Sequence, residues 1–295
     1  GELKYTGDVL SGMTTSTPLV TCLEFDSSGR LVMGGQDGIL RMATFAQDGA
    51  KGDGANMVQL VTLTSSPSQT SGKLSPILSL DISEELEMVA TAHANGNVCI
   101  HSIVDNAVNE IMDVKDNIWN PFGSDIHARS VAFVTYGDDG DACEQNSPSS
   151  HCGIVVGGGN GELWMQELHP SRYGNVPNPA AAAATDTEAT TTTAQPLFRE
   201  DSTQQIRPNH QGPVVTMASR PGGILVSADQ YGLLRMMQLS SGPKTASKTL
   251  YGLGGYKVWI GDVCIDSEGK RLLSDGRDDV CVVHDFSSDD DSWDV

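Results

Sequence analysis

The sequence predicts an all-β protein built from one antiparallel unit that recurs along the chain. Three observations point to this class: short apolar runs, tight turns rich in Gly, Asp and Asn, and the same order of runs and turns in several places. "LVMGGQDGILRMATF", from Leu31 to Phe45, is the clearest example. Its two apolar runs flank an Asp-Gly turn, a pattern typical of a β-hairpin.

The unit occurs five times. Continuous copies cover residues 18–45, 76–103, 213–239 and 260–286, and each reads as three apolar runs separated by two turns. Another copy starts with "ARSVAFV" at Ala128 and resumes with "GIVVGGGNGELWMQEL" at Gly153. Three antiparallel strands are expected in each copy. The residues at the equivalent tight turn are Gly38, Gly96, Gly161, Gly232 and Asp279.

The segments between the units are expected to supply a fourth strand. Candidates are residues 57–63, 107–114, 195–201 and 247–252. The last unit has none, because "SSDDDSWDV" at the end of the chain is too acidic to form one. "ELKYTGDVL", from Glu2 to Leu10, precedes the first unit and is expected to complete the last one. Such a strand closes a ring and removes an exposed sheet edge.

This layout resembles the WD-repeat β-propeller over nearly the whole chain. The resemblance implies four-stranded antiparallel blades around a central channel. Five blades are legible, with the ring closed by the N-terminal strand. Seven is the commonest number in that family, but residues 104–128 and 169–211 show no further set of three apolar runs.

A single propeller domain is expected over residues 1–286, followed by an acidic tail over 287–295. Insert loops are expected at about 46–56, 135–152 and 169–196. The order of the strands places all three inserts on one face of the propeller.

The residue signature of the WD-repeat family is eroded here, which leaves another propeller family as an alternative. The family joins neighbouring loops through a hydrogen-bonded set of His, Asp, Ser or Thr, and Trp. In the fourth unit His210 and Ser227 fit, whereas Tyr231 stands at the usual Asp position and Met237 at the Trp position. The set is therefore expected to be absent, with the blades held by apolar packing and strand ladders.

The charge balance excludes some classes of partner. Lys and Arg total 18 against 38 Asp and Glu, a formal net charge of -20. Nucleic acids and anionic membrane surfaces are bound mainly through Lys and Arg, so neither is expected as a partner. The chain has no apolar run that could span a membrane. A soluble intracellular protein is expected; because the first residue is Gly1, an organelle lumen or stroma stays open.

The six cysteines fall into two groups. Those inside apolar runs are expected to be small core residues: Cys22, Cys99, Cys264 and Cys281. Cys143 and Cys152 bracket a polar segment, as a possible disulfide or as two thiols.

Aromatic residues gather in two of the links between units. These links lead onto the face opposite the inserts and carry Trp119, Phe122, His127, Tyr251, Tyr256 and Trp259. Trp and Tyr on a rigid scaffold are common binding hot spots, and the family resemblance implies partner binding on this face. Alternatively, the rings plug gaps between blades. Trp259, next to a strand, is expected to be a plug, and Trp119 is expected to be the more exposed ring.

No catalytic, metal-binding or cofactor-binding motif is present. There is no Gly-x-Ser-x-Gly, phosphate-binding loop or His-Glu-x-x-His, and the His residues have no metal-ligand spacing. The expected function is a non-enzymatic protein–protein interaction scaffold, or a structural subunit of a multiprotein complex, without metal or cofactor. The alternative is a propeller hydrolase or small-ligand binder that uses the central channel. A pair of channel carboxylates would favour that alternative, and near the starts of the inner strands Asp262 is the one candidate.

Overall fold

The computed structural model describes residues 19–45, 58–62, 75–103, 118–123, 125–136, 151–168, 197–199, 201–220, 222–239, 247–253, 259–266, 270–276 and 280–285. Every named element within these ranges is a β-strand, which confirms the all-β prediction. The same ranges contain no helix long and apolar enough to cross a membrane. The three expected insert loops fall largely outside them.

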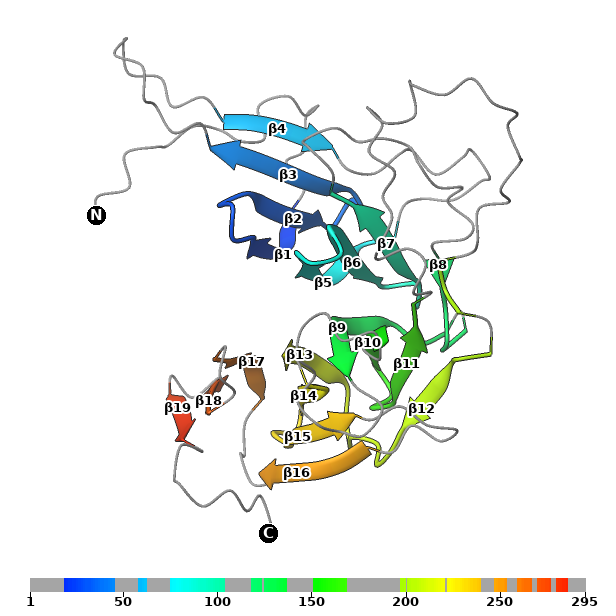
Figure 1. Cartoon of the computed structure of the whole chain (residues 1–295), viewed down its shortest axis with the longest axis vertical. Coiled ribbons are helices and arrows are strands. Elements are labelled where there is room, and N and C mark those ends of the chain that lie inside the picture. Colours follow the sequence, from blue (N-terminus) through cyan, green and yellow to red (C-terminus); the bar gives the residue numbers. More distant parts are fainter. Residues whose placement is uncertain are drawn as a thin grey trace, which may run out of the picture.

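The strands form five antiparallel sheets that follow one another along the chain (Figure 1). Sheet one contains β1 (Val20–Phe25), β2 (Leu31–Gly35), β3 (Leu40–Phe45) and β4 (Val58–Thr62). Sheet two contains β5 (Ile77–Ser83), β6 (Met88–His93), β7 (Val98–Ser102) and β8 (Ile118–Trp119). Sheet three contains β9 (Ala128–Tyr136), β10 (His151–Gly158), β11 (Leu163–Glu167) and β12 (Gln204–Ile206). Sheet four contains β13 (Val214–Arg220), β14 (Ile224–Asp229), β15 (Leu234–Leu239) and β16 (Ser247–Leu253). Sheet five contains β17 (Ile260–Ile265), β18 (Arg271–Gly276) and β19 (Cys281–Asp285).

The first strand of each sheet lies on the inside of the assembly. β1, β5, β9, β13 and β17 contact one another in that order, and the later strands of each sheet lie farther out (Figure 1). We call these five the inner strands. This arrangement of several antiparallel sheets is consistent with a β-propeller. The described residues of β17 and β1 make no comparable set of contacts, and the expected closing strand Glu2–Leu10 lies outside the described residues.

Two of the four predicted outer strands are confirmed. β4 and β16 form where residues 57–63 and 247–252 were expected to do so. In sheet two the outer neighbour of β7 is β8. The candidate outer strand at 107–114 lies outside the described residues.

The prediction of an outer strand over 195–201 in sheet three is wrong. There β12 pairs with β11, and Phe198 makes one isolated bridge with Leu168. A side chain replaces strand pairing at the end of β11, because the Ser202 hydroxyl accepts a hydrogen bond from the Glu167 N–H at 3.2 Å. A side-chain oxygen thus satisfies a donor that a neighbouring strand would otherwise satisfy.

The second tight turn has the same geometry in four sheets. The glycines predicted from the sequence, Gly38, Gly96, Gly161 and Gly232, have φ angles between 77° and 85°. Each donates its N–H to the carbonyl three residues earlier, at 3.0–3.2 Å. Residues with a side chain adopt this left-handed region reluctantly, so glycine is favoured at each position.

These turns are joined to the start of their own inner strand. The N–H of Gln36 donates to the carbonyl oxygen of Leu19 at 2.8 Å, and equivalent bonds join Ala94 to Pro76, Gly159 to His127 and Gln230 to Pro213. The turns and the residues before the inner strands therefore lie at one end of the sheets. We call this end the turn face.

Replacing Gly161 by Ala is expected to destabilise the protein more than replacing Gly29 by Ala. Both glycines have φ near 80°, so both variants bear the conformational cost of about 1 kcal/mol. A Cβ at Gly161 would lie 2.5 Å from the His210 carbonyl oxygen, whereas a Cβ at Gly29 meets nothing within 4 Å. Urea denaturation of the two variants measures the difference. Equal losses would show that the contact between this turn and the His210 link does not limit stability.

Four clusters of buried apolar residues fill the spaces between successive sheets. The cluster between sheets one and two includes Val32, Leu40 and Ile77, and that between sheets four and five includes Val226, Ile260 and Leu272. The prediction that Cys264 and Cys281 are core residues is wrong, because both are exposed on the side of sheet five that faces away from sheet four. Cys22 and Cys99 are half-buried.

Candidate functional site

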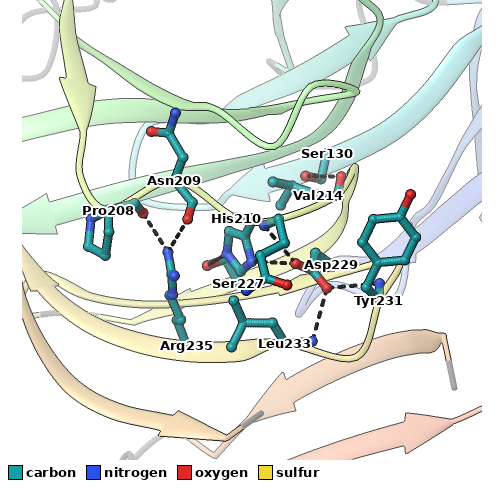
Figure 2. A network of polar contacts seen from close by, with 11 residues as sticks. Ser130, Pro208, Asn209, His210, Val214, Ser227, Asp229, Tyr231, Leu233 and Arg235 are labelled. Carbon is teal, nitrogen blue, oxygen red and sulfur yellow. Dashed lines mark hydrogen bonds and ion pairs between the residues drawn. The ribbon is translucent and has the colours of Figure 1, made fainter. Parts of the chain in front are cut away.

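A buried hydrogen-bonded set joins the link before β13 to sheet four (Figure 2). His210 Nε2 lies 2.7 Å from Ser227 Oγ, and His210 Nδ1 lies 3.3 Å from Asp229 Oδ2. The side chains of His210 and Asp229 have no exposed surface. The expectation that such a set is absent is therefore wrong. Asp229, at the end of β14, supplies the carboxylate in place of the residue at position 231.

Asp229 also organises the backbone of the turn. Its Oδ1 accepts hydrogen bonds from the N–H groups of Tyr231 and Leu233, each at 2.9 Å, and its Oδ2 accepts one from Gln211 at 3.2 Å. Burial alone would raise the pKa of Asp229, but the hydrogen bonds from His210 and the two turn amides hold it below its usual value. The carboxylate is therefore the charged centre of this turn.

The three other turns use a different capping position. Asp37, Asn95 and Asn160 stand two residues into their turns, where each side-chain Oδ1 accepts the N–H two residues later, at 3.1–3.2 Å. The equivalent residue in sheet four is Tyr231. Because Asp229 already caps this turn, position 231 is free to carry a side chain with no capping role.

Ser227, His210 and Asp229 are the residue types of a hydrolase triad, but their burial decides what they can do. Ser227 and Asp229 have 0% exposure, and His210 has 5%. A nucleophile must reach its substrate, whereas these buried groups hydrogen-bond to one another and to the backbone of the link and the turn. The set thus positions the link and the turn within sheet four. Arg235 adds to this by donating from Nη1 to the carbonyl oxygens of Pro208 and Asn209, at 2.5 and 2.7 Å (Figure 2).

Comparison with known families gives one match. The model of the WD domain, G-beta repeat, matches residues 6–42, which include β1, β2 and the start of β3. Residues 6–42 are therefore similar to a WD repeat. A search of curated proteins finds no match. The buried set in sheet four supplies the His, Ser and Asp that the WD-repeat resemblance implied, with the Asp displaced to 229 and Met237 at the Trp position.

The two tryptophans of the links, Trp119 and Trp259, differ in solvent exposure in the opposite sense to the one expected. Trp119 lies in β8, is half-buried against the core between sheets two and three, and has its ring centroid 6.3 Å from that of Phe198. Trp259, directly before β17, is 36% exposed. The prediction that Trp119 is the more exposed ring is wrong, as is the prediction that Trp259 is a plug. The reason is that the link itself pairs as the short strand β8 and so places the Trp119 ring over the core.

The other predicted site residues are divided between core, surface and undescribed positions. Phe122 packs against the same core as Trp119. His127 is exposed, with Nδ1 in contact with the Ala94 carbonyl oxygen. Tyr251 lies in β16, where side chains are not described, and Tyr256 lies outside the described residues.

Two exposed apolar side chains of the turn face were missed in the sequence. Tyr231 is 65% exposed and Leu19 is 67% exposed. The Tyr231 ring lies over Gly212, where an added Cβ would be 2.6 Å from Tyr231 Cδ2. In Figure 2 the ring points away from His210. A signal was available: Tyr231 is the one aromatic residue at a turn position otherwise held by Asp or Asn in the four legible turns.

Two carboxyl groups in the middle of the inner strands were not predicted, because the expected channel carboxylates were those near the strand starts. Glu24 in β1 and Asp81 in β5 occupy equivalent register positions on neighbouring inner strands. Asp81 Oδ2 accepts the Phe133 N–H at 2.6 Å, which joins β5 to β9. Burial and then the Asp81 charge raise the pKa of Glu24 to about 8, and burial raises the pKa of Asp81 to about 7.

The described residues give no support for a metal centre and leave the disulfide open. They hold no group of three or more His, Cys, Asp or Glu side chains that could bind a metal ion. Cys152 is buried in β10, and Cys143 lies outside the described residues, so a bond between them stays a prediction.

Proposed function

We propose that this protein is a non-enzymatic scaffold that binds other proteins, or a structural subunit of a multiprotein complex. WD repeats generally mediate protein–protein interaction, and the family match supports that general role. The observation that carries the proposal is the exposure of large apolar side chains on the rigid turn face. Such side chains on a fixed framework bind a partner with little loss of conformational entropy.

The proposed binding surface consists of His127, Tyr231 and Trp259, with Leu19 at its margin. Each of these residues is exposed and lies in a turn or immediately before an inner strand. The hydrogen bonds between the turns and the inner strands fix the backbone beneath them. Tyr256, in the same link as Trp259, lies outside the described residues and stays a predicted binding residue. Trp119 and Phe122 act as core residues in this proposal.

We further propose that the segment Glu2–Leu10 adds to β19 as the fourth strand of sheet five. The described part of that sheet has three strands, whereas each of the other sheets has four. The family match begins at residue 6, within this segment. An added strand would satisfy the open edge of β19.

Affinity capture from the native source with the Trp259→Ala, Tyr231→Asn double variant tests the binding surface. Asn is the residue found at the equivalent turn position in sheets two and three, so the second change is expected to leave the turn intact. We expect the double variant to lose a specific set of partners, since a central aromatic residue contributes about 2 kcal/mol or more to binding. A folded double variant that retains every partner would place the binding surface elsewhere. Gln211→Ala, an exposed change on the same link as His210, is the matched control.

The Glu24 and Asp81 carboxyls favour a second candidate function, a hydrolase or small-ligand binder in the central channel. Glycosidases use a pair of carboxyl groups, and the charge of Asp81 acts on Glu24. The charge of Asp262 also raises the pKa of Glu24, as the last of its causes. Asp262 Oδ1 accepts a hydrogen bond from the Thr216 hydroxyl at 2.7 Å. Turnover of glycoside substrates that Glu24→Gln abolishes would support this candidate over the scaffold. We favour the scaffold because Asp81 already uses a carboxylate oxygen to join β5 to β9.

A further inference from the structure

Sheet two carries a chain of polar side chains on one of its faces. Thr91 in β6 has no exposed surface, and its Oγ1 lies 3.0 Å from His93 Nε2 and 3.3 Å from His101 Nε2. The same hydroxyl lies 3.4 Å from the carbonyl oxygen of Cys99. On the other side of its ring, His93 Nδ1 lies 3.1 Å from the carbonyl oxygen of Ser75. We call His93, Thr91 and His101 the His–Thr–His relay.

The relay faces sheet one. Thr91 is the direct cross-strand partner of Leu80, and His101 is the direct partner of Val89. Direct partners point to the same side of a sheet, and both Leu80 and Val89 belong to the apolar cluster between sheets one and two. His93, two residues after Thr91, points to the same side. Three polar side chains thus lie beside an apolar core, where each polar atom needs a partner.

The partners of the two rings determine their tautomers when both rings are neutral. A carbonyl oxygen only accepts, so His93 Nδ1 carries the hydrogen that it donates to Ser75. His93 Nε2 then has a lone pair, which accepts a hydrogen bond from the Thr91 hydroxyl. Thr91 has one proton to give, so its oxygen accepts a hydrogen bond from the Nε2–H of His101. The two histidines therefore hold opposite tautomers.

The geometry also provides for one additional proton. A proton from solvent at His93 Nε2 turns this atom from an acceptor into a donor, and Thr91 Oγ1 becomes its acceptor. The Thr91 hydroxyl then rotates and donates to the Cys99 carbonyl oxygen at 3.4 Å. In this state Thr91 Oγ1 accepts from both rings. No covalent bond within the protein breaks, and the protein gains one proton.

Burial opposes this protonated state. It lowers the pKa of His93 below the ordinary value of 6.5, whereas the hydrogen bond to Ser75 raises it. Burial, and then the charge of His93, lower the pKa of His101 to about 4. The relay therefore takes up a first proton well before a second. The described titratable groups on the elements around it are Cys99 of β7, Cys22 and Glu24 of β1, and Asp125 and His127 of the link before β9.

Among the described strands this arrangement is specific to sheet two. Sheet four has Ser227 and Asp229 at the positions of the hydroxyl and the first ring, and hydrogen bonds hold the pKa of Asp229 below its usual value. In sheet five Ser274 Oγ lies 3.1 Å from His284 Nε2, but β18 ends at Gly276, which has no side chain. Sheets four and five therefore supply internal controls for an acid response of sheet two.

His93 ends β6 and connects the relay to the turn that follows. The Ala94 N–H donates to the Pro76 carbonyl oxygen, and the Asn95 N–H donates to Ser75 Oγ, each at 2.9 Å. Together with the bond from His93 to Ser75, these hydrogen bonds hold the turn against the start of β5. The charge state of His93 therefore acts at the point where the turn is attached.

We propose that the relay is an acid-responsive switch, which takes up one proton at His93 and thereby releases the turn of residues 93–97 from the start of β5. The reason is linkage, because His93 binds a proton more readily once the turn opens and its ring reaches water. The attachment is complete above pH 6.5 and weakens as the pH falls below this value. The loosening stays local, since the rotated Thr91 hydroxyl still bonds both rings.

This acid response goes beyond the proposed function and does not depend on what binds the turn face. It reaches that face where the Ala94 carbonyl oxygen contacts His127 Nδ1.

Nitrogen-15 NMR of the histidines in the full chain at pH 7.5 tests the relay itself. We expect His93 as the Nδ1–H tautomer and His101 as the Nε2–H tautomer, distinguished by the shifts of their ring nitrogens. The same tautomer in both rings would overturn the relay, because one of the contacts with Thr91 and Ser75 would then lack a hydrogen.

Amide hydrogen exchange tests the switch. The measured quantity is the protection factor of the Ala94 N–H. The Gln230 N–H is the internal control, because it makes the equivalent bond in sheet four, to the Pro213 carbonyl oxygen at 2.9 Å. Between pH 7 and pH 5 we expect protection at Ala94 to fall about tenfold, and protection at Gln230 to stay nearly constant. Equal changes at the two amides, or no change at Ala94, would overturn the switch.

Two substitutions at Thr91 separate the hydroxyl from the shape of the side chain. Thr91→Val leaves the protonated His93 Nε2–H without its acceptor, so we expect His93 to bind its proton about tenfold more weakly. Thr91→Ser keeps the hydroxyl, which is also the residue type at the equivalent positions in sheets four and five, and is expected to titrate like the parent. Equal titration of His93 in both variants would contradict the role of the hydroxyl. If Thr91→Val does not fold, the tautomers and the exchange of the parent chain still decide.

His127→Gln removes the other histidine that contacts this turn. We expect the acid-induced fall in protection at Ala94 to persist in this variant. Its disappearance would assign the response to His127 and overturn the proposal.

Discussion

Asp229→Ala is expected to lower the free energy of unfolding by about 3–5 kcal/mol, because it removes the charged partner of a buried network. The substitution leaves three backbone N–H groups and the His210 ring without their acceptor. None of these groups gains water in exchange while the turn stays folded, since Asp229 has 0% exposure. Urea denaturation followed by Trp fluorescence measures the loss.

Two further variants make this result interpretable. Asp229→Asn keeps one amide oxygen for the turn N–H groups and is expected to lose less stability, which provides a measurement if the Ala variant does not fold. Asn160→Ala removes an exposed cap from the equivalent turn in sheet three and is expected to cost about 1 kcal/mol. A loss in Asp229→Ala no greater than that in Asn160→Ala would contradict a central role for the buried set.

The stabilisation contributed by the protonated Glu24 carboxyl is expected to be lost as the pH rises from about 4.5 to about 8, and Glu24→Gln is expected to remove this contribution. Burial and the Asp81 charge raise the pKa of Glu24 from 4.5 to about 8, so the folded protein holds a proton that the unfolded chain releases. The stabilisation is fully present below pH 4.5 and is lost as the pH passes through about 8. Asp81, with its pKa raised to about 7, contributes in the same direction.

Thermal unfolding at a series of pH values checks this dependence. We expect Glu24→Gln to have a higher Tm than the parent protein near pH 8 and a similar or lower Tm near pH 4. Glu85→Gln, on the exposed turn after β5, removes one negative charge outside the inner strands and serves as the control. Parallel pH profiles for the parent and Glu24→Gln would show that Glu24 is ionised in the folded protein.

Local sequence determined the repeated unit. Gly38, Gly96, Gly161 and Gly232 were identifiable because a turn with positive φ favours glycine, and the apolar runs beside them alternate with the period of a strand. Strands β4 and β16 were also predictable, since each is a continuous run rich in strand-forming residues. The outer strands β8 and β12 were not predictable, because two or three paired residues leave almost no pattern.

The buried His210 set shows where position in the sequence misleads. The family pattern predicts the carboxylate at position 231, which is Tyr, but the carboxylate comes from Asp229, two residues earlier. Both positions lie in one tight turn, and only the fold decides which side chain points inward. The same uncertainty affects Trp119 and Trp259, whose exposures depend on whether a link pairs as a strand.

The sequence by itself determined the strand content, the turns and the all-β class of this protein, because these depend on contacts between residues close in the chain. Tertiary structure decided which side chains share a buried network and which carboxyls meet on the inner strands. Those properties depend on residues far apart in the chain: Glu24 and Asp81 are brought together by the packing of sheets one and two.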